Sequence, residues 1–195
     1  MDIHIDKRFP LAASAEQAWA VLADVHAVAA CMPGASITEV IDPTHFKGQV
    51  KSKVGPAVMS FAGTIDVLAL DAATRSLRLL GKGADRGGSS AAMDLSARIE
   101  AGENANTSVL VGQATVSVSG KLAQFGNRLL VPVADAMLDQ FAGNFAAAAA
   151  VQVNAELASA STTPARATTP ARELNALGLM WTVFIRWLAR LFGRA

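Results

Sequence analysis

Apolar residues occupy every second position between 91 and 99, and mostly polar residues stand between them. The apolar set is Ala91, Met93, Leu95, Ala97 and Ile99. A period of two is the pattern of a β-strand with one buried face. Similar runs over residues 36–41, 45–54, 57–70, 75–84 and 107–119 predict further strands. Clusters of Gly, Pro, Asp and Asn between the runs predict hairpin turns, and therefore an antiparallel sheet.

The first thirty residues follow a different pattern. Ile3 and Ile5 open a short predicted strand. Ser14 is followed three residues later by Gln17, which is the signature of a capping box at the start of a helix. A second short helix is expected over residues 25–31, before a Pro-Gly pair.

Residues 121–153 carry apolar side chains at spacings of three and four, which predicts one long helix with an apolar face. The order of elements is strand, two short helices, six strands and a long helix. We therefore expect an α+β fold in which a curved antiparallel sheet of about seven strands wraps around the long C-terminal helix. In this helix-grip arrangement a cavity commonly lies between the sheet and the helix.

Strand parity and helix face predict which side chains line such a cavity. The expected lining consists of Met59, Phe61, Leu79, Met93, Leu95, Val116 or Val118, Phe125, Leu129, Val133, Met137 and Phe141. Met and Phe side chains line adaptable apolar pockets, but they also fill ordinary cores. Both interpretations stay open at this point.

A linker is expected after this domain. Residues 155–172 are rich in Ala, Ser, Thr and Pro, and the sequence Thr-Thr-Pro-Ala-Arg occurs at 162–166 and again at 168–172. Proline interrupts helices and favours extended backbone at the residue before it. We therefore divide the chain into a domain (1–153), a linker (154–173) and a C-terminal segment (174–195).

The C-terminal segment is strongly apolar. Its uncharged run, residues 174–185, counts 12 residues, whereas a membrane-spanning helix needs about 20. We predict an amphipathic helix that lies in the lipid interface with its arginines at the headgroups. Its expected membrane-binding residues are Leu177, Met180, Trp181, Phe184, Ile185, Arg186, Trp187, Leu188, Arg190, Leu191 and Phe192. A tilted spanning helix and a helix packed on the domain or on a partner are the alternatives.

Charge is distributed unevenly along the chain. Residues 1–160 contain 12 Lys/Arg and 15 Asp/Glu, a net charge of −3, whereas residues 161–195 contain 5 Arg and 1 Glu, a net charge of +4. The acidic domain argues against nucleic acid as a partner, and the basic segment favours an anionic membrane surface. No secretory signal is visible at the N-terminus. We therefore expect a peripheral protein on the cytoplasmic face of the inner membrane.

Residues with catalytic chemistry are few. Cys31 is the single cysteine, which excludes an intramolecular disulfide and a Cys-based zinc or iron–sulfur site. It either lines a cavity mouth or is a small buried hydrophobic residue. Asp135 and Asp139 lie one helical turn apart, and we expect them on a solvated face. The histidines match no metal or triad spacing: His4, His26 and His45. We predict no catalytic residue and no metal site.

Several short motifs occur in a characteristic order. They are Cys-Met-Pro-Gly at 31–34, Lys-Val-Gly-Pro at 53–56, Phe-Ala-Gly at 61–63, Gly-Lys-Gly at 81–83 and Gly-Lys-Leu-Ala-Gln-Phe-Gly at 120–126. With these motifs the chain resembles the family of the G subunit of carbon monoxide dehydrogenase, within the START-like superfamily. The resemblance implies a non-catalytic accessory protein without a covalently bound cofactor. It implies that the protein recruits a molybdenum hydroxylase-type enzyme, such as a carbon monoxide dehydrogenase, to the cytoplasmic membrane. It also implies that a respiratory quinone is held in the apolar cavity and passes electrons to the respiratory chain.

Two alternatives belong to other functional classes. One is a membrane-recruitment module that carries no ligand. The other is a START-like cyclase or aromatase, an enzyme that needs polar groups inside its cavity, where this sequence places almost none.

Overall fold

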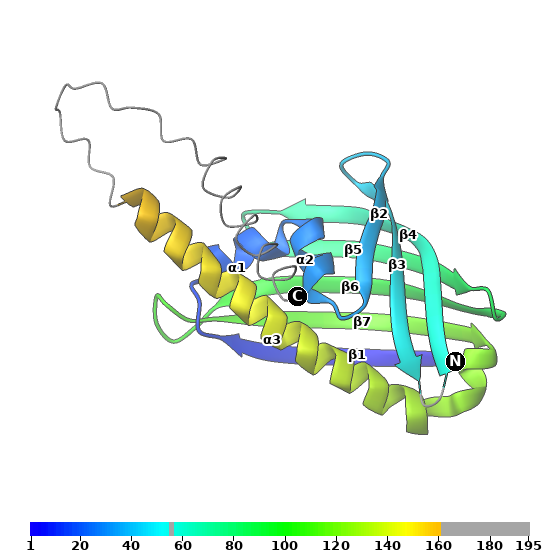
Figure 1. Ribbon diagram of the computed structural model, residues 1–195. Helices are drawn as coiled ribbons and strands as arrows, with labels where there is room; N and C mark the ends of the chain where they lie inside the picture. Colours follow the sequence, from blue (N-terminus) through cyan, green and yellow to red (C-terminus); the bar gives the residue numbers. More distant parts are fainter. Residues whose placement is uncertain (55–56, 161–195) are drawn as a thin grey trace, which may run out of the picture. The chain divides into compact units, whose positions relative to one another are not determined.

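The structure is a computed structural model that describes residues 1–54 and 57–160 (Figure 1). The predicted membrane-binding helix and most of the predicted linker lie outside these described residues.

Seven strands form one antiparallel sheet in the described part of the chain, as the alternation predicts. They are β1 (Asp2–Leu11), β2 (Ala35–Val40), β3 (His45–Val54), β4 (Ala57–Asp71), β5 (Ser76–Asp85), β6 (Ser89–Ala101) and β7 (Ser108–Gly120). The order across the sheet is β1-β7-β6-β5-β4-β3-β2. The N-terminal strand therefore pairs with the last one, and every other pair is formed by consecutive strands.

The helices are α1 (Ala15–Leu22), α2 (Val25–Cys31), the 3-10 helix η1 (Lys121–Phe125) and α3 (Gly126–Ala160). The predicted capping box at the start of α1 is confirmed. The backbone N–H of Gln17 donates to Ser14 Oγ (3.2 Å), and the backbone N–H of Ser14 donates to Gln17 Oε1 (2.9 Å). Two of the orphan N–H groups at this helix end are thereby satisfied.

The long helix differs from the expected range of 121–153 at both ends. Gly120 and Gly126 have φ values of 71° and 66°, a conformation that glycine adopts readily, so the chain changes direction on either side of η1. At the other end α3 continues to Ala160, into the expected linker. Residues 154–160 contain no Pro or Gly and several Ala, which favours helix over linker.

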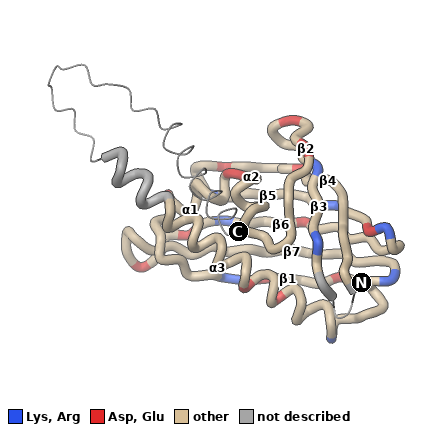
Figure 2. The backbone as a smooth tube through the Cα atoms, in the orientation of Figure 1, with Lys and Arg blue, Asp and Glu red and all other residues tan. Residues whose placement is uncertain are grey.

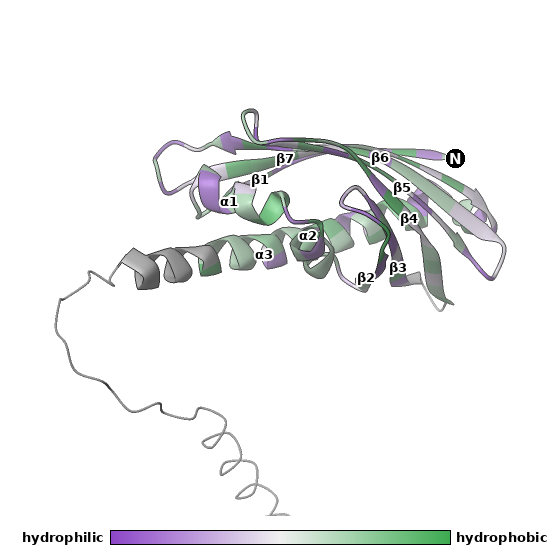
Figure 3. Cartoon of the chain, turned by 90° about the horizontal axis from the view of Figure 1, so that it is seen from above, coloured by the Kyte–Doolittle hydropathy of each residue, from purple (hydrophilic) through white to green (hydrophobic). Residues whose placement is uncertain are grey.

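The three α-helices of the described residues lie on one face of the sheet, which we call the inner face (Figure 3). Helices α1 and α2 contact each other and α3, and α1 also contacts β6 and β7. The two short helices therefore fill the space between one half of α3 and the sheet.

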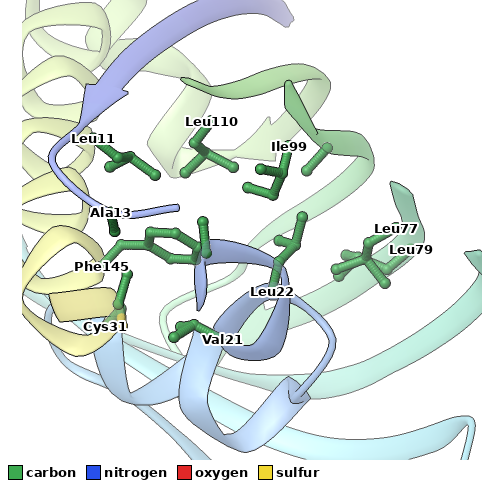
Figure 4. Close-up of a cluster of buried hydrophobic side chains, with 13 residues drawn as sticks. Leu11, Ala13, Val21, Leu22, Cys31, Leu77, Leu79, Ile99, Leu110 and Phe145 are labelled. Atoms are coloured by element: carbon green, nitrogen blue, oxygen red, sulfur yellow. The ribbon is translucent and has the colours of Figure 1, made fainter. Parts of the chain in front are cut away.

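The first core lies where α1, α2 and the C-terminal half of α3 meet the sheet. Phe145 of α3 is fully buried, and Figure 4 shows its ring among side chains from the N-terminal strand, α1 and α2. The buried members are Leu11, Ala13, Ala18, Val21, Leu22, Cys31, Leu77, Leu79, Ala97, Ile99, Leu110, Phe145 and Ala149. This cluster holds the helical layer on the sheet.

A second, smaller core lies at the N-terminal end of α3. Its buried members are Met59 of β4, Val118 of β7, Leu122 of η1 and Leu130 of α3. The hydroxyl of Ser89 accepts a hydrogen bond from the backbone N–H of Leu122 (3.0 Å), which ties η1 to β6. The fold therefore has two cores, one toward each end of α3.

Candidate functional site

The strand residues predicted to line a cavity face α3. Leu79 lies opposite Leu95 in the register of β5 and β6, and Met93 lies opposite Val116 in the register of β6 and β7. Leu79 belongs to the first core, against which Met93 and Leu95 pack. Val116 packs against the second core. The inner face of the sheet thus carries the predicted strand residues.

The predicted lining residues are divided between the two cores. Leu79, Met93, Leu95 and Phe141 belong to or pack against the first core. The members at the second core are Met59, Phe61, Val116, Val118, Leu129 and Val133. Phe125 lies in η1 with 40% of its surface exposed and belongs to neither cluster. The lining as a whole stays a prediction, because these contacts locate the side chains without a ligand.

Between the cores lies what we call the central region: Ile5, Lys7, Met93, Gly112 and Met137. Along α3, Val133 at the second core and Phe141 at the first are separated by about 12 Å, at 1.5 Å per residue. The inward-facing side chains Ile5, Met93 and Met137 are only half-buried. A Cβ atom built on Gly112 would meet no atom within 4 Å. Side chains therefore do not fill this part of the interior as they fill the two cores.

One charged pair bounds the central region, and we did not expect it from the sequence. Lys7 of β1 lies 2.8 Å from Asp135 of α3, measured from Nζ to Oδ1. The hydrogen bond and charge of Asp135, with a smaller contribution from Asp139, raise the pKa of Lys7 above its ordinary value. Asp139 is exposed, and the side chain of Asp135 is 46% exposed, so both lie on a solvated face as expected, but Asp135 also forms an ion pair with the sheet. The alternating pattern of β1 could have indicated a contact of Lys7 with α3, because Lys7 occupies an inward position between Ile5 and Phe9.

The same turn of α3 also touches the opposite side of the sheet. The hydroxyl of Ser52 on β3 donates to Met137 Sδ over 3.5 Å. Figure 2 shows how few charged positions α3 carries along its described length. The curved sheet therefore contacts α3 from β1 on one side and from β3 on the other, and the central region lies between these contacts.

Cys31 is 4% exposed and packs in the first core. Burial raises the pKa of its thiol, so the thiol stays protonated at neutral pH. Of the two interpretations left open, the structure supports a small buried hydrophobic residue.

The histidines lie apart and are exposed, as expected. His4 Nδ1 is 3.2 Å from Thr115 Oγ1, His26 meets Phe46 edge to face, and His45 Nδ1 is 2.8 Å from Asp42 Oδ2. Among residues 1–54 and 57–160, no three His, Cys, Asp or Glu side chains are grouped as metal ligands would be.

The outer face of the sheet carries two open hollows of about 690 and 550 Å³. Their outward-facing linings include His4, Asp6, Arg78 and Asp94 in the larger hollow and Lys82 in both. These side chains are polar or charged, and two of them form the ion pair Arg78–Asp94 (2.9 Å). Apolar side chains such as Leu80 and Ala92 also line them, but both hollows are wide open to solvent. A ligand site encloses most of its ligand, so the central region, which lies between the sheet and α3, is the better candidate site.

In the described part of the chain, no helix combines the length and the apolar character that crossing a membrane requires. The predicted interfacial helix at 174–195 lies outside those residues.

Solved structures with the same fold come from several bacteria. A conserved protein from Geobacillus kaustophilus superposes with a TM-score of 0.68 at 20% identity, over 76% of this chain and 95% of that one. An aromatase/cyclase from Streptomyces sp. R1128 gives 0.58 at 18% identity, over 78% and 96% of the two chains. A START superfamily protein from Mycobacterium smegmatis gives 0.54 at 14% identity, over 74% and 94%. At these identities the likeness shows a START-like fold.

No curated protein matches the chain. A family model does: that of CoxG, the G subunit of carbon monoxide dehydrogenase, matches residues 8–150. The match begins in the last four residues of β1 and runs through most of α3, so it includes the buried members of both cores, whereas Ile5 and Lys7 of the central region precede it. The chain therefore belongs to the CoxG family.

Proposed function

We propose that this protein carries a respiratory quinone between the sheet and α3. We also propose that residues 174–195 hold the protein at the cytoplasmic face of the inner membrane, together with a carbon monoxide dehydrogenase-like molybdenum hydroxylase. Family and fold are those of a ligand-binding accessory protein. The partner enzyme reduces the quinone, and the electrons pass on to the respiratory chain.

The observation that supports a carried ligand is the incomplete filling of the central region. Met93 and Met137 face the interior but are only half-buried, and the space beside Gly112 is open. Methionine side chains adapt their shape to a ligand at little cost, because they are unbranched. A flat apolar ring placed there gains contacts that the two cores do not already satisfy.

The expected affinity can be bounded from the area that a ring buries. An aromatic ring system buries about 150–250 Å². At about 25 cal/mol per Å² this contributes about 4–6 kcal/mol, which corresponds to a Kd no tighter than about 40 µM. The ring alone therefore binds weakly, and the prenyl chain of a natural quinone supplies the rest of the apolar contact.

A tether would increase the local supply of such a ligand. A polyprenyl quinone stays in the bilayer, so a carrier held at the lipid surface meets it far more often than one that diffuses freely. In the predicted interfacial helix, each arginine near an anionic leaflet contributes about 1 kcal/mol. Trp181 and Trp187 are residues of the kind that favours the membrane interface.

The test is lipid-extract mass spectrometry on the full chain, purified without detergent. We expect a quinone to co-purify with the wild type. Met93→Trp fills the central region and should reduce the bound quinone strongly, whereas Val58→Trp, at a position 75% exposed on β4, should not. A folded wild-type protein that carries no quinone would contradict quinone carriage and favour a recruitment module without a ligand.

A further inference from the structure

We infer that Lys7 binds the polar head of the carried ligand, by donating a hydrogen bond from Nζ to a carbonyl oxygen on the ring. This inference rests on the proposed function, because it assigns a residue to the same ligand. It concerns how the head is recognised, which neither the family match nor the fold specifies.

The first argument is the direction in which Lys7 faces. The register pairs Ile5, Lys7 and Phe9 with inner-face residues of β7. On the strands, within residues 1–54 and 57–85 and 89–120, Lys7 is the only Lys or Arg at an inner-face position by this parity. Its side chain is 41% exposed, and the side chain of Asp135, 2.8 Å away, is 46% exposed. Because β1 is an edge strand, Lys7 lies at the solvent-facing edge of the central region, where the polar head of a ligand can reach Nζ while its apolar part lies further in.

The second argument is the space next to it. Lys7 lies directly opposite Gly112, and Gly112 lies opposite Ala97 on the next strand. A Cβ on Gly112 would have no neighbour within 4 Å. Ala97 is already covered in the first core, so the open space lies over Gly112, and a flat ring can lie there with its edge toward Nζ.

The third argument is hydrogen-bonding capacity. A lysine ammonium has three donors, and the contact with Asp135 occupies one of them. Hydrogen bonds from a charged donor are stronger than those between neutral groups. The pair also suits both redox forms of a quinone, because a carbonyl oxygen accepts from Lys7 and a hydroxyl of the reduced ring donates to Asp135.

A structural role alone makes a different prediction. If the pair only joined β1 to α3, removing either partner would have the same effect. If Lys7 binds the head, Lys7→Met should weaken binding, whereas Asp135→Asn leaves the ammonium in place and should keep or increase it.

The experiment is equilibrium dialysis of the full chain, in excess, against two probes that share one ring system. The first is 2,3-dimethyl-1,4-naphthoquinone, whose methyl groups block addition of thiols. The second is 2,3-dimethylnaphthalene, which lacks the carbonyl oxygens. A matched control is Lys47→Met, because Lys47 forms an ion pair of the same length with Glu39 (2.8 Å) on an exposed surface. Thermal unfolding of each variant confirms that it is folded.

We expect Lys7→Met to lower the affinity for the naphthoquinone about tenfold, the loss typical of a hydrogen bond to a charged group. Its affinity for the hydrocarbon should not change, and Lys47→Met should match the wild type with both probes. The inference is overturned if Lys7→Met binds the naphthoquinone as the wild type does, or if Asp135→Asn loses as much affinity as Lys7→Met. In both cases quinone carriage still stands, whereas a wild type that binds neither probe overturns the proposed function as well.

Discussion

Asn144 of α3 donates a hydrogen bond from Nδ2 to the carbonyl oxygen of Cys31, the last residue of α2, over 2.9 Å. The last carbonyl groups of a helix have no partner within that helix. Asn144 supplies one, and it thereby joins two helices that are far apart in the sequence.

Replacing Asn144 with Ala should therefore destabilise the domain. We expect the free energy of unfolding to fall by about 1 kcal/mol, the typical net contribution of one such bond. Urea denaturation followed by circular dichroism measures the change. Asn127→Ala, at an exposed position near the start of the same helix, is the control and should have little effect. Equal losses in the two variants would mean that the contact with Cys31 does not stabilise the fold.

Phe145 and Phe125 provide a second matched comparison, because they differ in burial. Phe145 is 0% exposed and Phe125 is 40% exposed. Phe145→Ala should cost about 3–5 kcal/mol, since it leaves a cavity in the first core, whereas Phe125→Ala should cost less than about 1 kcal/mol. The midpoint of thermal unfolding reports both changes. A small loss for Phe145→Ala would contradict the position of the first core.

The pair of His45 and Asp42, in the turn between β2 and β3, should make the stability of this turn depend on pH. The hydrogen bond and charge of Asp42 raise the pKa of His45 above its ordinary value of 6.5. Because the folded pKa is the higher one, the added stability is fully present below pH 6.5 and is lost as pH rises through the folded pKa. An NMR titration of the His45 ring should therefore give a pKa above 6.5. In Asp42→Asn the pKa should fall, and an unchanged value would show that the pair does not form in solution.

The residue patterns predict most of this fold but only part of its site. Alternation around Met93 and Leu95 identifies strands and their inner faces, because a half-buried sheet imposes a period of two. Helical periodicity places Phe125 on the apolar face of a continuous helix. It fails there because η1 has about 3.0 residues per turn instead of 3.6, which turns Phe125 toward solvent.

The central region was not predictable from the sequence in the same way. Periodicity gives the face on which Met137 lies, but not the distance between that face and the sheet. The Lys7–Asp135 pair depends on β1 pairing with β7 and on α3 crossing the sheet, which are long-range features. Only the inward position of Lys7 in its strand could have indicated it.

The predicted interfacial helix at residues 174–195 can be tested through the localisation of the protein. Phe184→Asp combined with Trp187→Asp should move the protein from the membrane fraction to the soluble fraction, because charged groups in the apolar face oppose interfacial burial. High salt alone should not release the wild type, since salt screens charges but does not weaken apolar contacts. Thr182→Asp, on the arginine face, is the control and should stay bound. A wild type that is already soluble after cell lysis would contradict the anchor.

The central claim is that a quinone lies between the two cores, on the inner face of the sheet. The most direct measurement is photo-crosslinking of the full chain with a quinone that carries a diazirine on its short prenyl chain, followed by peptide mapping. We predict crosslinks to the inner-face residues Met93 and Leu95 of β6 and to Val133, Met137 and Phe141 of α3, resolved to single residues. Crosslinks confined to the outer-face residues His4, Arg78 and Lys82, or to residues 174–195, would contradict it.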